Sequence, residues 1–184
     1  YKKRFSELHL VSQCDVRINF DYLKHDLTKF AIACFCAELI DSITQIEDAH
    51  SELFDLLIAL LLSLGNERTS HALIYSFVIK ALSLSGFQPH LESCVVCQSE
   101  IAKHAFFSNR LGGLLCDRCR YRDEQRENIH AGTIATILFL QKKSWPGSLR
   151  LHLLPSVERQ LNRIIFSFLD FNIEKKLKSL KILD

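Results

Sequence analysis

The sequence predicts a mainly α-helical protein, a helical bundle into which one small cysteine-rich module is inserted. Three observations predict this fold class. Apolar residues recur at helical spacing through most of the chain, two Cys-x-x-Cys pairs lie near its middle, and the 184 residues include only six glycines and three prolines. Helical periodicity with few breakers is typical of packed helices that are joined by short connections.

The first twelve residues are the one part of the chain that we expect to belong to another domain. They include Phe5, Leu8 and Val11 without helical spacing, and we expect residues 1–12 to be the last strand of a domain that lies upstream. Methionine is absent, even at position 1, which favours a chain without its natural start. Residues 13–184 are expected to form the helical domain.

Five segments of that domain have helical periodicity. The predicted helices cover about residues 21–46, 51–64, 69–85, 133–143 and 155–171. The second is apolar on nearly every face, so we expect it to be the central helix of the bundle. Gly65 and Gly86 follow the second and third helices and are expected to end them, Gly65 as a left-handed C-cap. Pro155 suits the first turn of the last helix.

The first predicted helix is expected to bury one apolar stripe. Its members are Leu23, Leu27, Phe30, Ala31, Cys34, Phe35, Leu39 and Ile43. Cys34 and Cys36 are two positions apart, so on a helix they point in different directions and do not easily share a ligand. Together with Cys14, we interpret them as small apolar side chains.

The remaining four cysteines predict a metal site. Cys94 and Cys97 form one Cys-x-x-Cys pair, and Cys116 and Cys119 form another after eighteen intervening residues. Two such pairs at this separation are typical of a tetrahedral four-thiolate zinc site, which is closed and therefore structural. The alternatives are disulfides or redox-active pairs, and nothing else in the sequence indicates an oxidising compartment. We expect a four-cysteine, zinc-ribbon-like module at about residues 92–121, with one structural Zn²⁺ per chain.

The eighteen residues between the two pairs are expected to form a hairpin. Residues 105–115 have short apolar runs, and Gly112 and Gly113 provide backbone freedom for a turn or for the approach to the second pair. His90 and His104 lie close enough to compete as ligands, but four cysteines already complete the site.

Charge and hydropathy limit the functional classes. The apolar run at residues 56–62 is far shorter than the ~18–20 residues of a membrane span, so we expect a cytoplasmic protein with no membrane contact. Residues 117–184 carry thirteen Lys and Arg against eight Asp and Glu, whereas residues 1–116 carry ten against thirteen. A basic C-terminal part favours an acidic partner, although many basic helix faces bind nothing.

An ordered set of short motifs resembles one known family. Leu84-Ser-Gly-Phe-Gln-Pro89 precedes the first cysteine pair, and Phe107-Ser108 with Gly112-Gly113-Leu114 precedes the second. Ala37-Glu-Leu-Ile40 lies on the first helix, and Leu177-Lys-Ser-Leu-Lys181 ends the chain. This combination resembles the C-terminal part of the bacterial RecO family of recombination mediators, over about residues 8–182.

The resemblance implies a fold and a function. RecO proteins have an N-terminal OB-fold, of which residues 1–12 would be the last strand, followed by a helical domain that holds a zinc-ribbon-like insertion. It implies a non-catalytic mediator of DNA repair and recombination that binds single- and double-stranded DNA and anneals complementary strands. With RecR and the single-stranded-DNA-binding protein SSB, such a mediator helps to load RecA. A bacterial, nucleoid-associated location follows from the same resemblance.

Two sets of site residues follow from this hypothesis. Phosphate contacts are expected from basic residues, which give affinity without reading sequence. The candidates are Arg118, Arg120, Arg122, Lys175, Lys176, Lys178 and Lys181, with Lys2, Lys3 and Arg4 beside the absent barrel. A docking site for the acidic, Phe-ending tail of SSB is expected to use Arg68, Tyr75, Phe77 and Lys80. Some family members carry an Arg pair where this chain has Tyr75 and Ser76.

The same resemblance implies that the zinc has a structural and not a chemical role, because some family members have lost the cysteines.

Three alternatives to this hypothesis stay open. A thiol oxidoreductase would normally place Cys-x-x-Cys in a βαβ setting, and none is predicted here. A zinc-stabilised helical scaffold that binds only protein would share the fold but not the DNA affinity. The basic side chains and the core-forming apolar side chains also have the plain reading of solvated surface and core.

Overall fold

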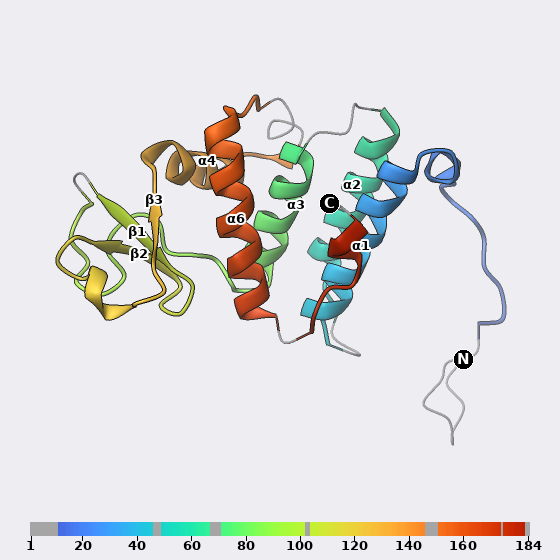
Figure 1. Ribbon diagram of the computed structural model, residues 1–184. Helices are drawn as coiled ribbons and strands as arrows, with labels where there is room; N and C mark the ends of the chain where they lie inside the picture. Colours follow the sequence, from blue (N-terminus) through green and yellow to red (C-terminus); the bar gives the residue numbers. More distant parts are fainter. Residues whose placement is uncertain are drawn as a thin grey trace, which may run out of the picture.

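A computed structural model describes residues 11–45, 49–66, 71–101, 104–145, 151–173 and 175–182 of the chain. Within these residues the helices are α1 (Leu27–Ile43), α2 (Ser51–Asn66), α3 (His71–Leu84), α4 (Ala131–Lys142) and α6 (Pro155–Asn172). The strands are β1 (Ala105–Ser108), β2 (Gly113–Cys116) and β3 (Glu127–Ile129). The small sheet lies at one end of the helices and is inserted between α3 and α4 (Figure 1). The predicted fold class, a helical bundle with an inserted four-cysteine module, is confirmed.

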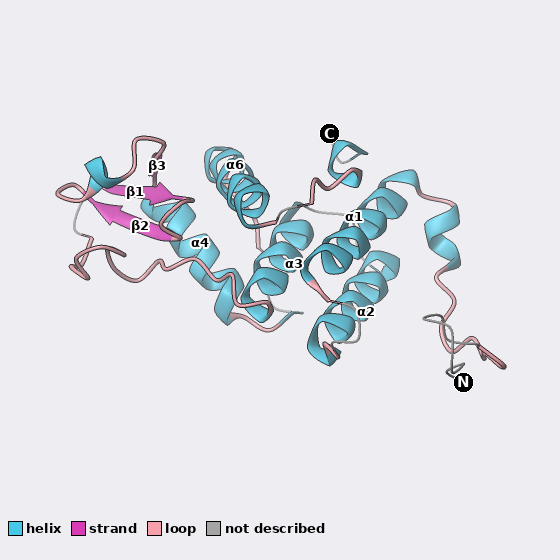
Figure 2. Ribbon diagram, turned by 90° about the horizontal axis from the view of Figure 1, so that it is seen from below, coloured by secondary structure: helices cyan, strands magenta, loops and turns pink. Residues whose placement is uncertain are grey.

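The central helix of the bundle is α3 and not α2. Of its fourteen residues, α3 buries ten, and it contacts α1, α2, α4 and α6. Figure 2 shows α3 between α1 and α2 on one side and α4 and α6 on the other. The prediction for α2 was wrong, since α2 buries one stripe (Leu53, Leu56, Leu60 and Leu64) and leaves Phe54 exposed. An all-apolar composition shows that a helix can be surrounded, but its neighbours decide whether it is.

The first helix begins later than its periodicity indicates. Residues Asp21–Lys24 form a separate 3₁₀ turn, and Asp26 caps α1 by accepting a hydrogen bond of 3.1 Å from the Lys29 backbone N–H. Leu27 and Phe30, expected in the buried stripe, are therefore exposed, at the open first turn of the helix. The helix ends at Ile43 and not near residue 46, because the backbone of Thr44 is extended, with a ψ of 153°. The Thr44 hydroxyl donates to the Ile40 carbonyl at 2.8 Å and caps this end.

The two helix-ending glycines have different roles. Gly86 has a φ of +81°, and the Phe87 N–H beyond it donates to the Leu82 carbonyl at 2.9 Å, so the predicted end of α3 is confirmed. Gly65 was predicted wrongly, because it lies inside α2 and has no positive φ. A Cβ at Gly65 would lie 3.0 Å from the Tyr22 ring, so this glycine allows close packing of the 3₁₀ turn on α2.

Three antiparallel strands make up the sheet, in the order β2-β1-β3. The predicted hairpin is confirmed, with Ala105 paired with Cys116 and Ser108 paired with Gly113. The third strand was not predicted. β3 has three residues, Glu127–Ile129, within a charged stretch that has no strand-like alternation, and it is held by pairing with β1.

The sheet shares one wall with the helical core. Along β1, Phe107 points into the main core, where its ring meets Phe168 of α6 edge-on at 5.6 Å between centroids. The adjacent Phe106 belongs to a second, smaller core that contains Leu115 and three of the module's cysteines. Successive strand residues face opposite sides of a sheet, so β1 contributes side chains to both cores. All four of its residues are therefore buried.

The C-terminal segment is attached to α1 by one carboxylate. Glu38 accepts hydrogen bonds from the backbone N–H groups of Lys178 (2.9 Å) and Ser179 (2.8 Å), and from the Ser179 hydroxyl. The Ser179 hydroxyl and N–H, followed by the Lys178 N–H, hold the pKa of Glu38 below its ordinary value. Glu38 therefore fixes the start of the last 3₁₀ turn, Ser179–Ile182, against α1.

Two further predictions concern the N-terminal strand and membrane contact. Of the strand predicted at residues 1–12, residues 1–10 lie outside the described part, and residues 11–12 have no regular structure. Among the helices of the described part, none combines the length and the apolar composition that a membrane crossing needs.

Candidate metal centre and basic surface

The first cysteine pair forms a tight turn against the hairpin. The Gln98 N–H donates to the Cys94 carbonyl at 2.8 Å, and the Cys94 N–H donates to the Ser99 carbonyl at 3.0 Å. Gln98 has a φ of 59°, the left-handed conformation that closes the turn. The Val95 N–H donates to the Leu114 carbonyl at 2.8 Å, which fixes this pair beside β2.

The second pair continues directly from β2. Cys116 is the last residue of that strand, and the Cys119 N–H donates back to its carbonyl at 3.0 Å. A 3₁₀ turn, Arg120–Arg122, follows at once, with the Arg122 N–H donating to the Cys119 carbonyl at 3.0 Å. The strand and the turn therefore set the directions of both side chains.

Gly112 and Gly113 meet two separate requirements. Gly112 has a φ of +70° and makes the hairpin turn, where its N–H donates to the Asn109 carbonyl. Gly113 permits a close approach, because a Cβ there would lie 2.4 Å from the His90 carbonyl oxygen. The Leu114 N–H donates to that same carbonyl at 2.9 Å, which holds the segment before the first pair on the hairpin.

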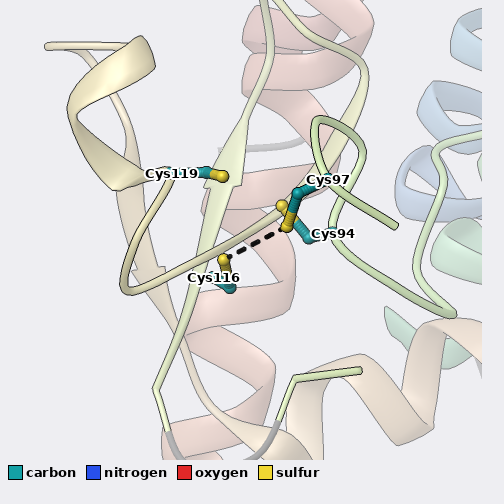
Figure 3. Close-up of side chains that lie close together, drawn as sticks. All are labelled: Cys94, Cys97, Cys116 and Cys119. Carbon is teal, nitrogen blue, oxygen red and sulfur yellow. Dashed lines mark hydrogen bonds between the residues drawn. The ribbon is translucent and has the colours of Figure 1, made fainter. Parts of the chain in front are cut away.

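The two turns bring the four sulfurs together (Figure 3). All four Sγ atoms lie within 4.8 Å of one another, and those of Cys97 and Cys116 are 3.7 Å apart. A tetrahedral zinc with Zn–S bonds of about 2.3 Å needs S–S separations of about 3.8 Å, so the geometry fits a four-thiolate metal site. Cys94, Cys116 and Cys119 are buried and Cys97 is exposed. Four protein ligands complete a tetrahedron, which suits a structural and not a catalytic metal.

The thiol pKa differs between cysteines of the cluster. Hydrogen bonds from the Ser99 hydroxyl, 3.1 Å from the sulfur, and from the Ser99 N–H lower the pKa of Cys97 to about 6. Burial, followed by hydrogen bonds with the neighbouring sulfurs, raises the pKa of Cys119 to about 12. A group of sulfurs this close favours one thiolate and opposes four, and a bound divalent cation would remove that opposition.

The histidines near the module do not join the sulfurs. His90 Nε2 lies 2.8 Å from the Ser93 hydroxyl, and His104 is exposed. Cys14 is exposed, Cys34 is half-buried and Cys36 is buried, and none of the three belongs to the cluster.

The arginines predicted to bind DNA lie on the second cysteine turn. Arg118, Arg120 and Arg122 are all exposed. Arg120 pairs with Asp117 at 3.4 Å, and its guanidinium lies 5.9 Å from the centre of the Phe106 ring. Arg122 lies 5.5 Å from the centre of the Tyr121 ring. The three arginines are therefore exposed within one five-residue segment of the module.

One buried acid, which no motif in the sequence singles out, orders this surface. Asp123 accepts a hydrogen bond of 2.5 Å from the Ser108 hydroxyl and another of 3.1 Å from the Gln125 N–H. Arg110 lies 3.9 Å from the same carboxylate, and its guanidinium donates to the Arg122 carbonyl. Asp123 thus attaches the segment after the cysteines to β1 and adds Arg110 to the basic surface.

The predicted lysines lie elsewhere. Lys175, Lys176 and Lys178 are exposed on the segment that Glu38 fixes beside α1, with Lys175 4.0 Å from Asp41. Figure 1 and Figure 2 both show α6 between this segment and the cysteine module. The arginines and the lysines therefore lie on two separate surfaces. The side chain of Lys181, like Lys2, Lys3, Arg4 and Arg68, lies outside the described residues.

Of the residues predicted for the SSB tail, the three that the structure describes do not line one groove. Tyr75 lines a groove of about 610 Å³ between α3, α6 and Leu180, and its hydroxyl donates to Asn162 at 3.3 Å. Burial raises the pKa of this hydroxyl to about 12. Lys80 lines a different groove of about 370 Å³ and donates to the Lys143 carbonyl at 2.6 Å. Phe77 is fully buried, with its ring edge-on to Trp145.

Fold and site together define a mainly helical protein with an inserted four-cysteine module that could hold a metal ion. The family model described as "Recombination protein O C terminal" matches residues 24–181. The chain belongs to the RecO family, whose members are non-catalytic recombination mediators, and this membership implies a role in DNA repair and recombination.

Individual relatives agree with the family match. The chain is similar to the "DNA repair protein RecO" of Pelotomaculum thermopropionicum, with 32% identity over 99% of the chain and 71% of that relative. The chain is also similar to proteins of the same name from two other organisms. Its identity to the protein of Desulforamulus reducens is 27%, over 98% of the chain and 71% of that relative. Its identity to the protein of Syntrophus aciditrophicus is 28%, over 100% of the chain and 72% of that relative. The chain thus covers about 70% of their length.

Proposed function

We propose that the chain acts as a RecO-type mediator by binding and not by catalysis. It binds single- and double-stranded DNA, promotes annealing of complementary strands, and with RecR and SSB helps to load RecA onto coated strands. Its place is the bacterial cytoplasm, at the nucleoid. One Zn²⁺ per chain, held by Cys94, Cys97, Cys116 and Cys119, keeps the module folded. The surface that carries this proposal is the group of exposed arginines on the second cysteine turn.

The arginines suit phosphate contacts better than the lysines do individually. Arg118, Arg120 and Arg122 extend from a backbone that is fixed by Cys119 and Asp123. Planar guanidiniums on a rigid turn lose little freedom when they bind phosphate oxygens. Lys175, Lys176 and Lys178, and Lys181 with Lys2, Lys3 and Arg4, are proposed as further contacts for a longer strand. Phosphate contacts carry no sequence information, which fits a mediator that must act on any sequence.

Replacing Arg118 and Arg122 with alanine should weaken binding to single- and double-stranded DNA alike. Each lost phosphate contact reduces the slope of log K against log salt by about 0.7 for single strands. We expect a slope change of about 1.4 for the double variant, measured by anisotropy of a labelled mixed-sequence single strand at several salt concentrations. Lys24→Ala is the matched control, because Lys24 is an exposed cation that pairs with Asp21 away from both surfaces. Affinity that does not depend on ionic strength contradicts the proposal, and complete absence of DNA binding favours the protein-only scaffold.

The acidic tail of SSB fits the groove beside Tyr75 better than the groove beside Lys80. The Lys80 groove is also lined by Glu52 and Asp55, which repel an acidic peptide. The Tyr75 groove is lined by Arg159 and by apolar Phe166 and Leu180, which suit a terminal phenylalanine and its carboxylate. Its lining also includes one acid, Glu158, whose carboxylate lies 2.6 Å from His71 Nδ1, whereas the Lys80 groove has two. We place the tail there, with Tyr75 and Arg159 as contacts.

An Arg159→Glu variant should bind a synthetic acidic peptide with a free C-terminal phenylalanine at least about 10-fold more weakly, since one charge-assisted contact is worth about 1.5–3 kcal/mol. Lys80→Glu is the matched control and should leave the affinity unchanged, as measured by calorimetric titration of both variants. Loss of affinity in Lys80→Glu alone would instead place the tail in the other groove. Unchanged affinity in both variants would exclude both grooves as the binding site of the tail.

A further inference from the structure

Tyr121 is the most exposed phenylalanine, tyrosine or tryptophan that the structure describes, with 68% of its surface in solvent. It is the middle residue of the turn Arg120–Arg122, directly after the last metal ligand. An aromatic ring on a solvated turn contributes nothing to either core, and neither core includes it. Its surface is therefore available to a partner.

The ring is held in place by its neighbours. The Arg122 guanidinium lies 5.5 Å from the centre of the ring, a distance that suits a cation–π contact. The backbone of the turn is fixed by the Arg122 N–H bond to Cys119 and by the Arg110 guanidinium on the Arg122 carbonyl. Buried Asp123 attaches the end of the turn to β1 through Ser108. A ligand that meets this ring therefore meets a flat surface and a cation already in position.

We propose that Tyr121 stacks on an unpaired base of single-stranded DNA, with the guanidinium of Arg122 on the adjoining phosphate. This inference rests on the proposed function and assigns to this surface its preference for single strands. Base faces are free in a single strand and are covered by neighbouring base pairs in a duplex. An aromatic ring can therefore stack on the bases of a single strand and not on those of a duplex. Every base has such a face, so stacking gives affinity without choosing a sequence.

Charge alone does not account for this surface. Asp117 pairs with Arg120 at 3.4 Å, and four thiolates that hold a Zn²⁺ would carry a net charge of about −2 beside the arginines. The local field is therefore weaker than the arginine count indicates, and phosphate contacts alone give modest affinity. A stacked base adds about 1–3 kcal/mol that does not depend on salt.

The test compares Tyr121→Ala and Tyr121→Phe in the zinc-loaded chain. The probes are a labelled thymidine 20-mer, which has no secondary structure, and a labelled mixed-sequence duplex of two complementary strands without a loop. Tyr121→Ala should lower affinity for the single strand by about 5- to 150-fold, leave duplex affinity unchanged and leave the salt slope unchanged. Tyr121→Phe should keep wild-type affinity, because stacking needs the ring and not the hydroxyl. Phe54→Ala, at a ring that is 62% exposed on α2, is the control and should change neither affinity.

The outcomes separate this inference from the function on which it rests. Wild-type single-strand affinity in Tyr121→Ala, with weaker binding in the Arg118 and Arg122 double variant, overturns the stacking role and leaves the mediator proposal standing. Equal losses for single strand and duplex in Tyr121→Ala also overturn it, since a stacking residue cannot act on a closed duplex. Failure of the wild-type chain to bind either probe removes both proposals.

Discussion

Replacing Cys94 with serine should release the metal and unfold the cysteine module. Cys94 is fully buried, and its sulfur lies within 4.8 Å of the other three. Structural zinc contributes about 10–16 kcal/mol to the folding of small zinc peptides, more than the whole stability of many domains. The module's own core is small, because it consists of five buried residues, three of which are cysteines.

The loss should reach the helices as well. Phe107 and Leu114 of the hairpin belong to the main core, so an unfolded module exposes apolar surface of α6 and α3. We expect the melting temperature, followed by circular dichroism, to fall by more than about 10 °C, since each 1 kcal/mol shifts it by about 2–4 °C in a chain of this size. Metal analysis should find one zinc per wild-type chain and none in the variant.

Cys14→Ser is the matched control for this prediction. Cys14 is exposed and lies outside the cluster, so zinc content and melting temperature should match the wild type. A Cys94→Ser chain that keeps its zinc and its melting temperature contradicts the structural role. A variant that stays folded yet loses DNA affinity would instead make the metal centre part of the DNA-binding surface.

The parts of this fold that the sequence predicts are those that short-range spacing encodes. Cysteine spacing predicted the sulfur cluster, since the ligands of each turn are three residues apart and the hairpin between them returns the chain. Gly86 ended α3 as expected, because a left-handed C-cap is a local property of the chain. Pro155 likewise begins α6 at its first turn.

The parts that were missed depend on contacts between distant segments. No local pattern distinguishes Asp123 or Gln160 from other polar residues, because their partners come from β1, β3 and α4. The place of α2 at the edge of the bundle is likewise a property of its neighbours. Tyr121 had a signal that could have been used, an aromatic residue between two arginines directly after a metal ligand.

Gln160 of α6 joins the end of the module to the helices. Its side-chain oxygen accepts hydrogen bonds from the His130 N–H (2.9 Å) and the Thr133 hydroxyl (2.7 Å), and its amide group donates to the Asn128 carbonyl at 3.0 Å. Thr133 is fully buried, and Gln160 is 8% exposed. One side chain therefore provides hydrogen-bond partners for backbone groups at the end of β3 and at the start of α4, where the first N–H groups of a helix have no partner within it.

Gln160→Leu should lower the free energy of unfolding by about 1–3 kcal/mol, the cost of one buried polar group without a partner. The leucine fills a similar volume but leaves the buried Thr133 hydroxyl unpaired. The other two groups that lose Gln160, the His130 N–H and the Asn128 carbonyl, are only partly buried and add less. Urea unfolding followed by circular dichroism measures the loss, and metal analysis should still find zinc, because the smaller core that contains the cysteines includes no residue of α6.

Arg163→Ala is the control for Gln160→Leu, since Arg163 joins the same helix to the same strand through Glu127 at 2.5 Å. That pair is partly solvated, and its loss should cost less than about 1 kcal/mol. Equal effects of the two variants would mean that the junction depends on general contact between α6 and β3. A stability for Gln160→Leu within about 0.5 kcal/mol of the wild type would show that water replaces the amide, and that packing alone of Phe107 on Phe168 orients the module.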